Sequence, residues 1–150
     1  YNVTMGLKTS EEEIDKSIKI GQFEKVVQRL EKGLKTNVLE KGVSLSGGEK
    51  QRLALARGLL AAKNSEIMFM DEPTSNVDSI NEIKIHENIF SEFKGKTIIS
   101  SIHRLHLLNK FDYIYMFESG KIVGEGTLKD IRKNPKFLKI WEKSNLEKEE

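Results

Sequence analysis

The stretch from Val43 to Asp78 constrains the fold of this chain more than any other part. It joins a Ser-Gly-Gly turn at residues 46–48, a run of good helix formers that reaches Ala62, and the apolar run Ile67–Met70. An unbroken apolar run of this length predicts a strand that is buried on both faces of a parallel sheet. The stretch therefore predicts a turn, a helix and a core strand in direct succession.

Both ends of this stretch suit phosphate chemistry. A helix that begins after Ser46 exposes backbone amides without intrahelical partners at the positive end of its macrodipole. Adjacent carboxylates that leave a strand point in opposite directions, so Asp71 can bind a hard cation while Glu72 addresses a water. Each feature alone also has an ordinary explanation, as a flexible turn or as a core strand that reaches solvent.

Together the two features resemble a known family. LSGGEKQR at 45–52, followed by a helix and by IMFMDEPTSNVD at 67–78, is similar to the signature motif, Walker B strand and D-loop of the ATP-binding-cassette (ABC) ATPases. The resemblance implies an α/β, P-loop NTPase-like core, in which helices flank a parallel sheet. It covers residues 1–150, with part of the helical signature subdomain at about 1–62 and the core from the Walker B strand onward at about 63–150.

One part of the family's domain is absent from the sequence. A P-loop ATPase needs a G-x-x-x-x-G-K-[ST] loop to cradle the β- and γ-phosphates, and the 150 residues contain none. We therefore expect the chain to be the later part of an ABC domain, without the N-terminal part that carries the P-loop. Alone it should neither bind ATP tightly nor hydrolyse it.

The resemblance also implies which residues meet a partner. In the family, two nucleotide-binding domains close head to tail, and each ATP lies between the P-loop of one and the signature of the other. Ser46, Gly47 and Gly48 would face the γ-phosphate of the partner's ATP, and Asp78 would report across the interface. Glu49 stands where the commonest signature has Gln, and we assign it no ligand role because its charge would repel a triphosphate.

The same comparison implies the hydrolytic residues. Asp71 would hold Mg²⁺ through water, and Glu72 would orient and deprotonate the attacking water. The β-rich run Thr97–Ile102 delivers His103 at a strand's carboxyl end, where ligands of open parallel sheets collect. Ser-Ile-His-Arg-Leu resembles the family's switch region, so His103 would bridge Glu72 and the phosphate. We interpret the other two histidines as surface or packed residues.

Capping and periodicity predict the remaining elements. A Ser10–Glu13 capping box opens a helix that ends at Gly21, and Asp78 or Ser79 caps another that runs to about Phe93. Further predictions are an amphipathic helix with Phe23, Val26, Val27 and Leu30 on one face, a hairpin of Tyr113–Phe117 and Lys121–Val123 that turns at Gly120, and a capping box of Thr127 and Asp130.

Composition limits the partners, metal sites and membrane contacts that the chain can have. Lys and Arg number 25 against 23 Asp and Glu, so nothing suggests attraction to nucleic acid. Cysteine is absent, which excludes disulfides and thiolate metal sites. No stretch approaches the apolar length that spans a bilayer, so any membrane role must come from a partner or from a further part of the same polypeptide.

The leading hypothesis is the ATP-hydrolysing domain of an ABC transporter, at the cytoplasmic face of a membrane. Its partners would be a second nucleotide-binding domain, in a homodimer or heterodimer, and the coupling helices of transmembrane domains. Export-type similarity rests on Thr36–Gly42, His103–Leu105 and Gly120–Thr127. Two alternatives stay open, namely a non-transport ABC ATPase of DNA repair, chromosome organisation or translation, and a non-enzymatic interaction half-domain.

Overall fold

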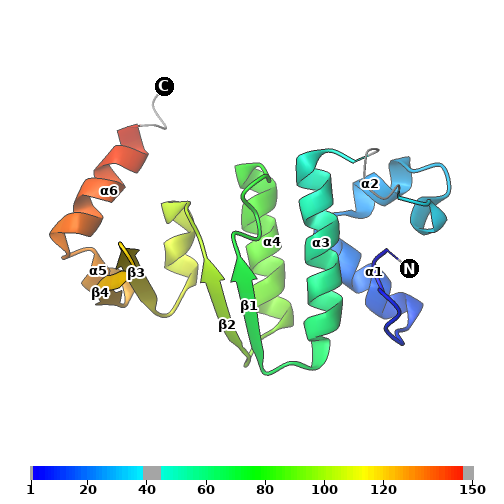
Figure 1. Cartoon of the computed structure of the whole chain (residues 1–150), viewed down its shortest axis with the longest axis horizontal. Helices are drawn as coiled ribbons and strands as arrows, with labels where there is room; N and C mark the ends of the chain where they lie inside the picture. Colours follow the sequence, from blue (N-terminus) through cyan, green and yellow to red (C-terminus); the bar gives the residue numbers. More distant parts are fainter. Residues whose placement is uncertain (1, 39–44, 147–150) are drawn as a thin grey trace. The chain divides into compact units, whose positions relative to one another are not determined.

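The computed structural model describes residues 2–38 and 45–146, and the chain folds into two compact units, Tyr1–Ser101 and Ile102–Glu150. The first unit contains α1 (Glu11–Ile20), α2 (Glu24–Arg29), η1 (Gly33–Lys35), α3 (Gly47–Ala61), η2 (Ala62–Asn64), β1 (Ile67–Asp71), α4 (Ser79–Glu92) and β2 (Thr97–Ser101) (Figure 1). The second contains η3 (Leu105–Lys110), β3 (Ile114–Glu118), β4 (Lys121–Gly126), α5 (Leu128–Ile131) and α6 (Pro135–Leu146).

Helices α1 and α4 begin where their capping residues predict. Ser10 accepts a hydrogen bond from the Glu13 amide while the Glu13 carboxylate accepts one from the Ser10 amide, which confirms the capping box of α1. Asp78 caps α4, also as predicted. The export-like segment Thr36–Gly42 lies partly outside the described residues, since these omit 39–44.

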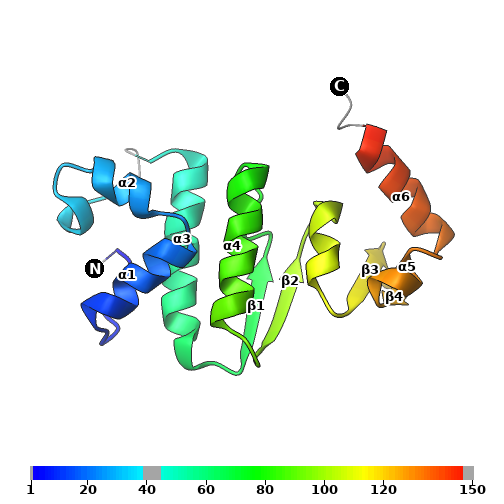
Figure 2. The same ribbon diagram turned by 180° about the vertical axis from the view of Figure 1, so that it is seen from behind.

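The sheet of the first unit is parallel, as predicted. β1 pairs with β2 in a register that sets Met68 opposite Ile98 and Asp71 opposite Ser101. Figure 1 shows β1 in front of α4 with β2 beside it, and Figure 2, from behind, shows α4 in front of β1. Met68 packs in one core with side chains from α1, α3, α4 and the residues that flank α4. These side chains are Ile20, Leu59, Val77, Ile85, Ile89 and Phe93.

Burial of β1 on both faces was a wrong prediction. Met68 is 8% exposed, whereas Phe69 is 74% and Ile67 is 52% exposed. The alternate positions of β2 follow the same rule, because Ile99 is 49% exposed while Ile98 packs against the core. Successive side chains of a strand point to opposite faces, and the helical core covers one face of this sheet.

The second unit is a hairpin with short helices. β3 and β4 are antiparallel, and the turn residues Ser119 and Gly120 both have positive φ, at 49° and 74°. This is the turn that a two-residue hairpin loop favours, so the predicted hairpin is confirmed. Leu108, Ile131 and Phe137 form a separate core, and Thr127 with Asp130 forms the predicted capping box of α5.

Helices in the described part of the chain fall short of the length and apolar character needed to cross a membrane.

Candidate functional site

The N-terminus of α3 is built by a second capping box. The Ser46 hydroxyl accepts from the Glu49 amide at 3.3 Å, and the Ser46 amide donates to the Glu49 carboxylate at 2.8 Å. The amides of Gly47 and Gly48 occupy the first two helical positions, which have no intrahelical partner. Ser46 and Gly47 are exposed, so these donors lie at the surface of the first unit.

The carboxylate of Glu49 is used within the chain. It forms an ion pair with Arg29 at 2.8 Å, and its side chain is only 12% exposed. The hydrogen bond from the Ser46 amide lowers the pKa of Glu49, and Arg29 lowers it further, while burial acts in the opposite direction. Glu49 is therefore a charged capping residue whose negative charge Arg29 compensates.

Gly48 allows a close approach between the first turn of α3 and the loop that follows β1. A Cβ on Gly48 would lie 2.5 Å from the backbone oxygen of Asn76, in the loop that follows β1. A Cβ on Gly47 would meet nothing within 4 Å. The two glycines therefore differ, because only the second is required by packing in this structure.

The acidic pair stands at the carboxyl end of β1. Asp71 is its last residue, and Glu72 follows with φ 42°, in the left-handed region that costs a non-glycine residue roughly 1–3 kcal/mol. The Ser101 hydroxyl donates to Asp71 Oδ1 at 2.6 Å and accepts from the Glu72 amide at 2.9 Å. Ser101 lies opposite Asp71 in the parallel register, which explains how one side chain reaches both residues.

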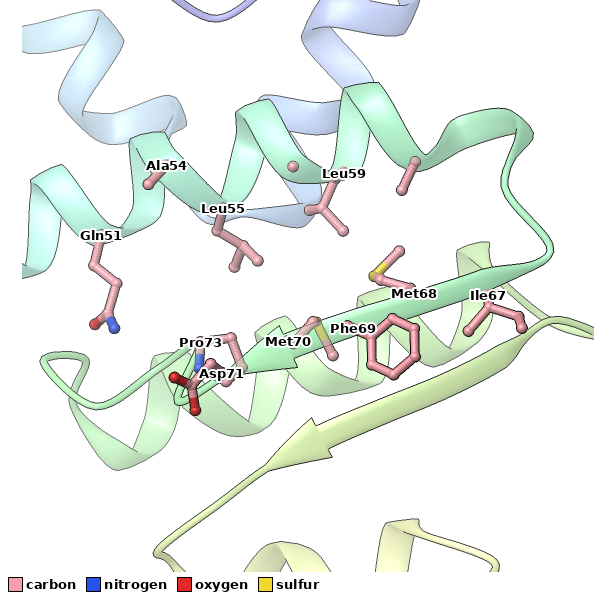
Figure 3. A pocket seen from close by; sticks show the side chains of 12 residues that line it. Gln51, Ala54, Leu55, Leu59, Ile67, Met68, Phe69, Met70, Asp71 and Pro73 are labelled. Atoms are coloured by element: carbon pink, nitrogen blue, oxygen red, sulfur yellow. The ribbon is translucent and has the colours of Figure 1, made fainter.

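Gln51 connects α3 to the loop after β1. Its Nε2 donates to the Glu72 carbonyl at 2.9 Å and to Ser75 Oγ at 2.9 Å. Its Oε1 accepts from the Asn76 amide at 2.8 Å. Figure 3 shows Gln51 extending from α3 at one end of a mostly apolar pocket between α3 and β1, near Asp71. The amide-rich helix start and the acidic pair thus belong to one connected structure.

This arrangement matches known proteins. A family model described as "ABC transporter" matches residues 3–75. The solved structure of a bacterial Atm1-family ABC exporter with ATP bound is similar, with a TM-score of 0.84 and 33% identity over 95% of this chain and 25% of that one. The chain belongs to the ABC transporter family.

The sequence relatives agree with this assignment to the ABC transporter family. A Rickettsia typhi protein named as an export ATP-binding/permease protein is 39% identical over 88% of this chain and 23% of its own length. A Bacillus subtilis protein named as a multidrug resistance ABC transporter is 40% identical over 83% and 21%. The mesentericin transport/processing protein of Leuconostoc mesenteroides is 38% identical over 84% and 17%. The chain therefore spans at most about a quarter of each relative's length.

Two further residues that the ABC resemblance singled out lie in different units. Asp78 is exposed, and its carboxylate accepts from the Asn81 amide at 3.0 Å and from the Asn81 side chain at 2.6 Å. The side-chain bond lowers the pKa of Asp78 most, followed by the backbone bond. His103 is exposed and follows β2 as predicted, but it belongs to the second unit, whereas Glu72 belongs to the first.

The described residues contain no cluster of three or more His, Asp, Glu or Cys side chains that could hold a metal by themselves. Asp71 offers an exposed carboxylate at a strand end. Mg²⁺ keeps several waters and binds through one or two carboxylates plus substrate phosphates. A single protein carboxylate therefore fits a nucleotide-bound magnesium and does not fit a metal held by protein alone.

Sequence reasoning missed Gln51, Ser101 and a buried polar group under the D-loop. There, Thr74 donates to the Glu82 carboxylate at 2.7 Å, and His86 Nδ1 lies 3.0 Å from the Glu82 carbonyl oxygen. Thr74, Glu82 and His86 are each at most 3% exposed. His86 is thus a packed residue.

Proposed function

We propose that this chain is part of the ATP-hydrolysing domain of a membrane exporter and that it couples ATP binding and hydrolysis to substrate transport. The supporting observation is the connection, through Gln51, between an exposed helix N-terminus and a strand-end pair of acids. The first suits a phosphate and the second suits a nucleophilic water. Exporters among the relatives support this function over a non-transport ATPase or an interaction half-domain.

In the proposed reaction, Glu72 orients a water and takes its proton while the oxygen attacks the γ-phosphorus. The bond from that phosphorus to the β-phosphate oxygen breaks, and ADP leaves with the electron pair. Asp71 would hold Mg²⁺ through water, and the ion would neutralise charge that develops on the phosphates. His103 would bridge Glu72 and the γ-phosphate in the assembled site.

A complete site would need a second domain. Ser46, Gly47 and Gly48 would donate to the γ-phosphate of ATP bound by the partner in a head-to-tail homodimer or heterodimer, where preorganised donors act most strongly. Asp78 would report across that interface. Transmembrane domains would contact the pair through coupling helices and hold it at the cytoplasmic face of the membrane. Within the chain, about 1–62 would be the signature subdomain and about 63–150 the core.

The sequence supplies no P-loop, so we infer that residues 1–150 alone neither bind ATP tightly nor turn it over. Calorimetry with Mg²⁺ and ATP tests this directly. Micromolar affinity for the 150-residue chain would contradict it.

Glu72→Gln in the full-length polypeptide tests the proposed function. Loss of the base should lower kcat for ATP hydrolysis by about 10²–10⁴-fold, while ATP binding persists because the triphosphate contacts remain. Glu66→Gln is the matched control, since Glu66 is an exposed acid that directly precedes the other end of the same strand. A Glu72→Gln protein with parental kcat, or a parent without ATPase activity, would contradict the proposal.

A further inference from the structure

Both peptide groups of Glu72 are held by side chains from other elements. The amide on its N-terminal side donates to Ser101 Oγ at 2.9 Å, from the end of β2. The carbonyl on its C-terminal side accepts from Gln51 Nε2 at 2.9 Å, from the first turns of α3. Glu72 itself has φ 42°, which a residue with a Cβ keeps only when its surroundings enforce it.

We propose that Gln51 and Ser101 are positioning residues that jointly fix the backbone of Glu72 and thereby aim its carboxylate at the attacking water. This proposal rests on the proposed function, because it concerns the direction of the proposed base. Neither residue would touch the nucleotide, and each would act through its hydrogen bonds to residues at the end of β1 and in the loop that follows it.

Ser101 does two things with one hydroxyl. It donates its proton to Asp71 and receives the Glu72 amide, so the proposed metal-binding acid and the proposed base are fixed by the same atom. Without the hydroxyl, the Glu72 amide loses its acceptor and the Asp71 carboxylate loses a donor. The backbone of Glu72 then has one restraint fewer against leaving the left-handed region, and the bond from Gln51 remains.

Gln51 adds a connection to the helix that carries the signature. Its two amide hydrogens and its carbonyl oxygen bond three groups in the loop after β1, and Gly48 packs against Asn76 in the same loop. Any shift at the α3 N-terminus therefore moves the backbone of Glu72. In the proposed closed pair, the partner's phosphate at Ser46–Gly48 would in this way influence the base that serves this chain's own nucleotide.

Five variants separate positioning from simple stability, and one of them, Gln51→Ala, removes the whole side-chain amide and serves only in the exchange measurement. Ser101→Ala removes the hydroxyl, and Ser101→Thr restores it. Gln51→Glu keeps an acceptor for Asn76 but loses both donors and sets a negative charge against the Glu72 carbonyl. Ala61→Ser is the control on α3, because Ala61 is exposed and lies at the opposite end of the helix from the signature residues.

ATPase kinetics of the full-length polypeptide provide the first readout. Ser101→Ala and Gln51→Glu should lower kcat by about ten- to a hundredfold, the loss that follows when a reacting group is displaced by about 1 Å. KM for ATP should stay within about threefold, and Ser101→Thr and Ala61→Ser should match the parent. Parental kcat in both Ser101→Ala and Gln51→Glu would overturn the proposal.

Amide exchange in the 150-residue chain provides a readout that needs no activity. Ser101→Ala should accelerate exchange of the Glu72 amide by about tenfold or more, and Ser101→Thr should not. Gln51→Glu should leave the Asn76 amide protected, whereas Gln51→Ala should expose it. Unchanged protection in Ser101→Ala and Gln51→Ala would overturn the contacts themselves. A full-length parent without ATPase activity, together with the expected exchange pattern, would overturn the proposed function and leave the contacts established.

Discussion

The N-termini of α1 and α3 use the same cap but differ in the two residues that follow it. Both begin with a serine whose hydroxyl accepts from the amide three residues later, and both return a glutamate to the serine amide. In α1 the next two residues are Glu11 and Glu12, whereas in α3 they are Gly47 and Gly48. α1 thus places two carboxylates at its first two helical positions, whereas α3 has only backbone amides at these two positions.

This difference separates a structural helix start from a candidate anion site. Carboxylates in the first turn satisfy the macrodipole internally, so an external anion would be repelled from α1. At α3 the single acid, Glu49, is turned into the cap and paired with Arg29, so its charge is compensated. A capping box alone therefore has no functional meaning, and the residues at the first two helical positions decide what the helix start can bind.

The largest expected effect tests this comparison through activity. Ser46→Asp should lower ATP hydrolysis by the full-length polypeptide about a hundredfold, because a carboxylate would stand where the phosphate is proposed to bind. Asp caps helices as well as Ser does, so the stability of the 150-residue chain should change by less than about 0.5 kcal/mol.

Ser10→Asp is the matched control, since it sets the same carboxylate against the same capping glutamate in α1. Ser10→Asp should change neither the rate of ATP hydrolysis nor the stability of the 150-residue chain. Equal loss of activity in both variants would show that the two helix starts do not differ in function.

The second effect concerns packing at α3. Gly48→Ala should destabilise the 150-residue chain by about 1–3 kcal/mol, because the new Cβ would overlap the Asn76 backbone oxygen. Gly47→Ala should leave stability equal or raise it by up to about 1 kcal/mol, since that position is open and Ala favours helix. Urea unfolding measures both. Equal stability of the two variants would mean that the loop after β1 moves away at no cost.

The smallest effect concerns the capping acids. Both Glu13 and Glu49 have a lowered pKa, the first mainly through the Lys63 side chain and the second mainly through the Ser46 amide. A lowered pKa means that the unfolded chain binds the proton more readily. The stabilisation is therefore present above the ordinary glutamate pKa and is lost as the pH falls through the lower folded value.

Salt should distinguish the two acids. The Glu13–Lys63 pair is exposed at both partners, with side chains 39% and 37% exposed, so salt should weaken its contribution. The backbone bond to Glu49 should persist. At 1 M NaCl we expect the difference in acid-side loss of stability between Glu13→Gln and the parent to shrink to the part that the Ser10 amide supplies, and Glu49→Gln to keep a shallower pH dependence than the parent. Urea unfolding between pH 3 and 6 measures this, and identical curves for Glu49→Gln and parent would contradict it.

Local features of the fold were predictable because local chemistry produces them. Ser10, Asp78 and Thr127 are capping residues whose bonds reach only three positions along the chain, and the Ser119-Gly120 turn depends on two backbone conformations. The strand of β1 and its acidic end were also predictable from an apolar run followed by charge. What failed was the burial of its second face, because that depends on which elements pack there.

The sequence by itself determined the family, the helix starts and the residue types of the candidate site, since motif order and capping are written in neighbouring positions. Only the tertiary structure decided that Gln51 and Ser101 hold the two sides of Glu72, and that Gly48 meets Asn76. These contacts join residues 21 to 29 positions apart, and no local pattern encodes them. They arise because a parallel register and a helix packed on the same strand bring three separate elements to one end of the sheet.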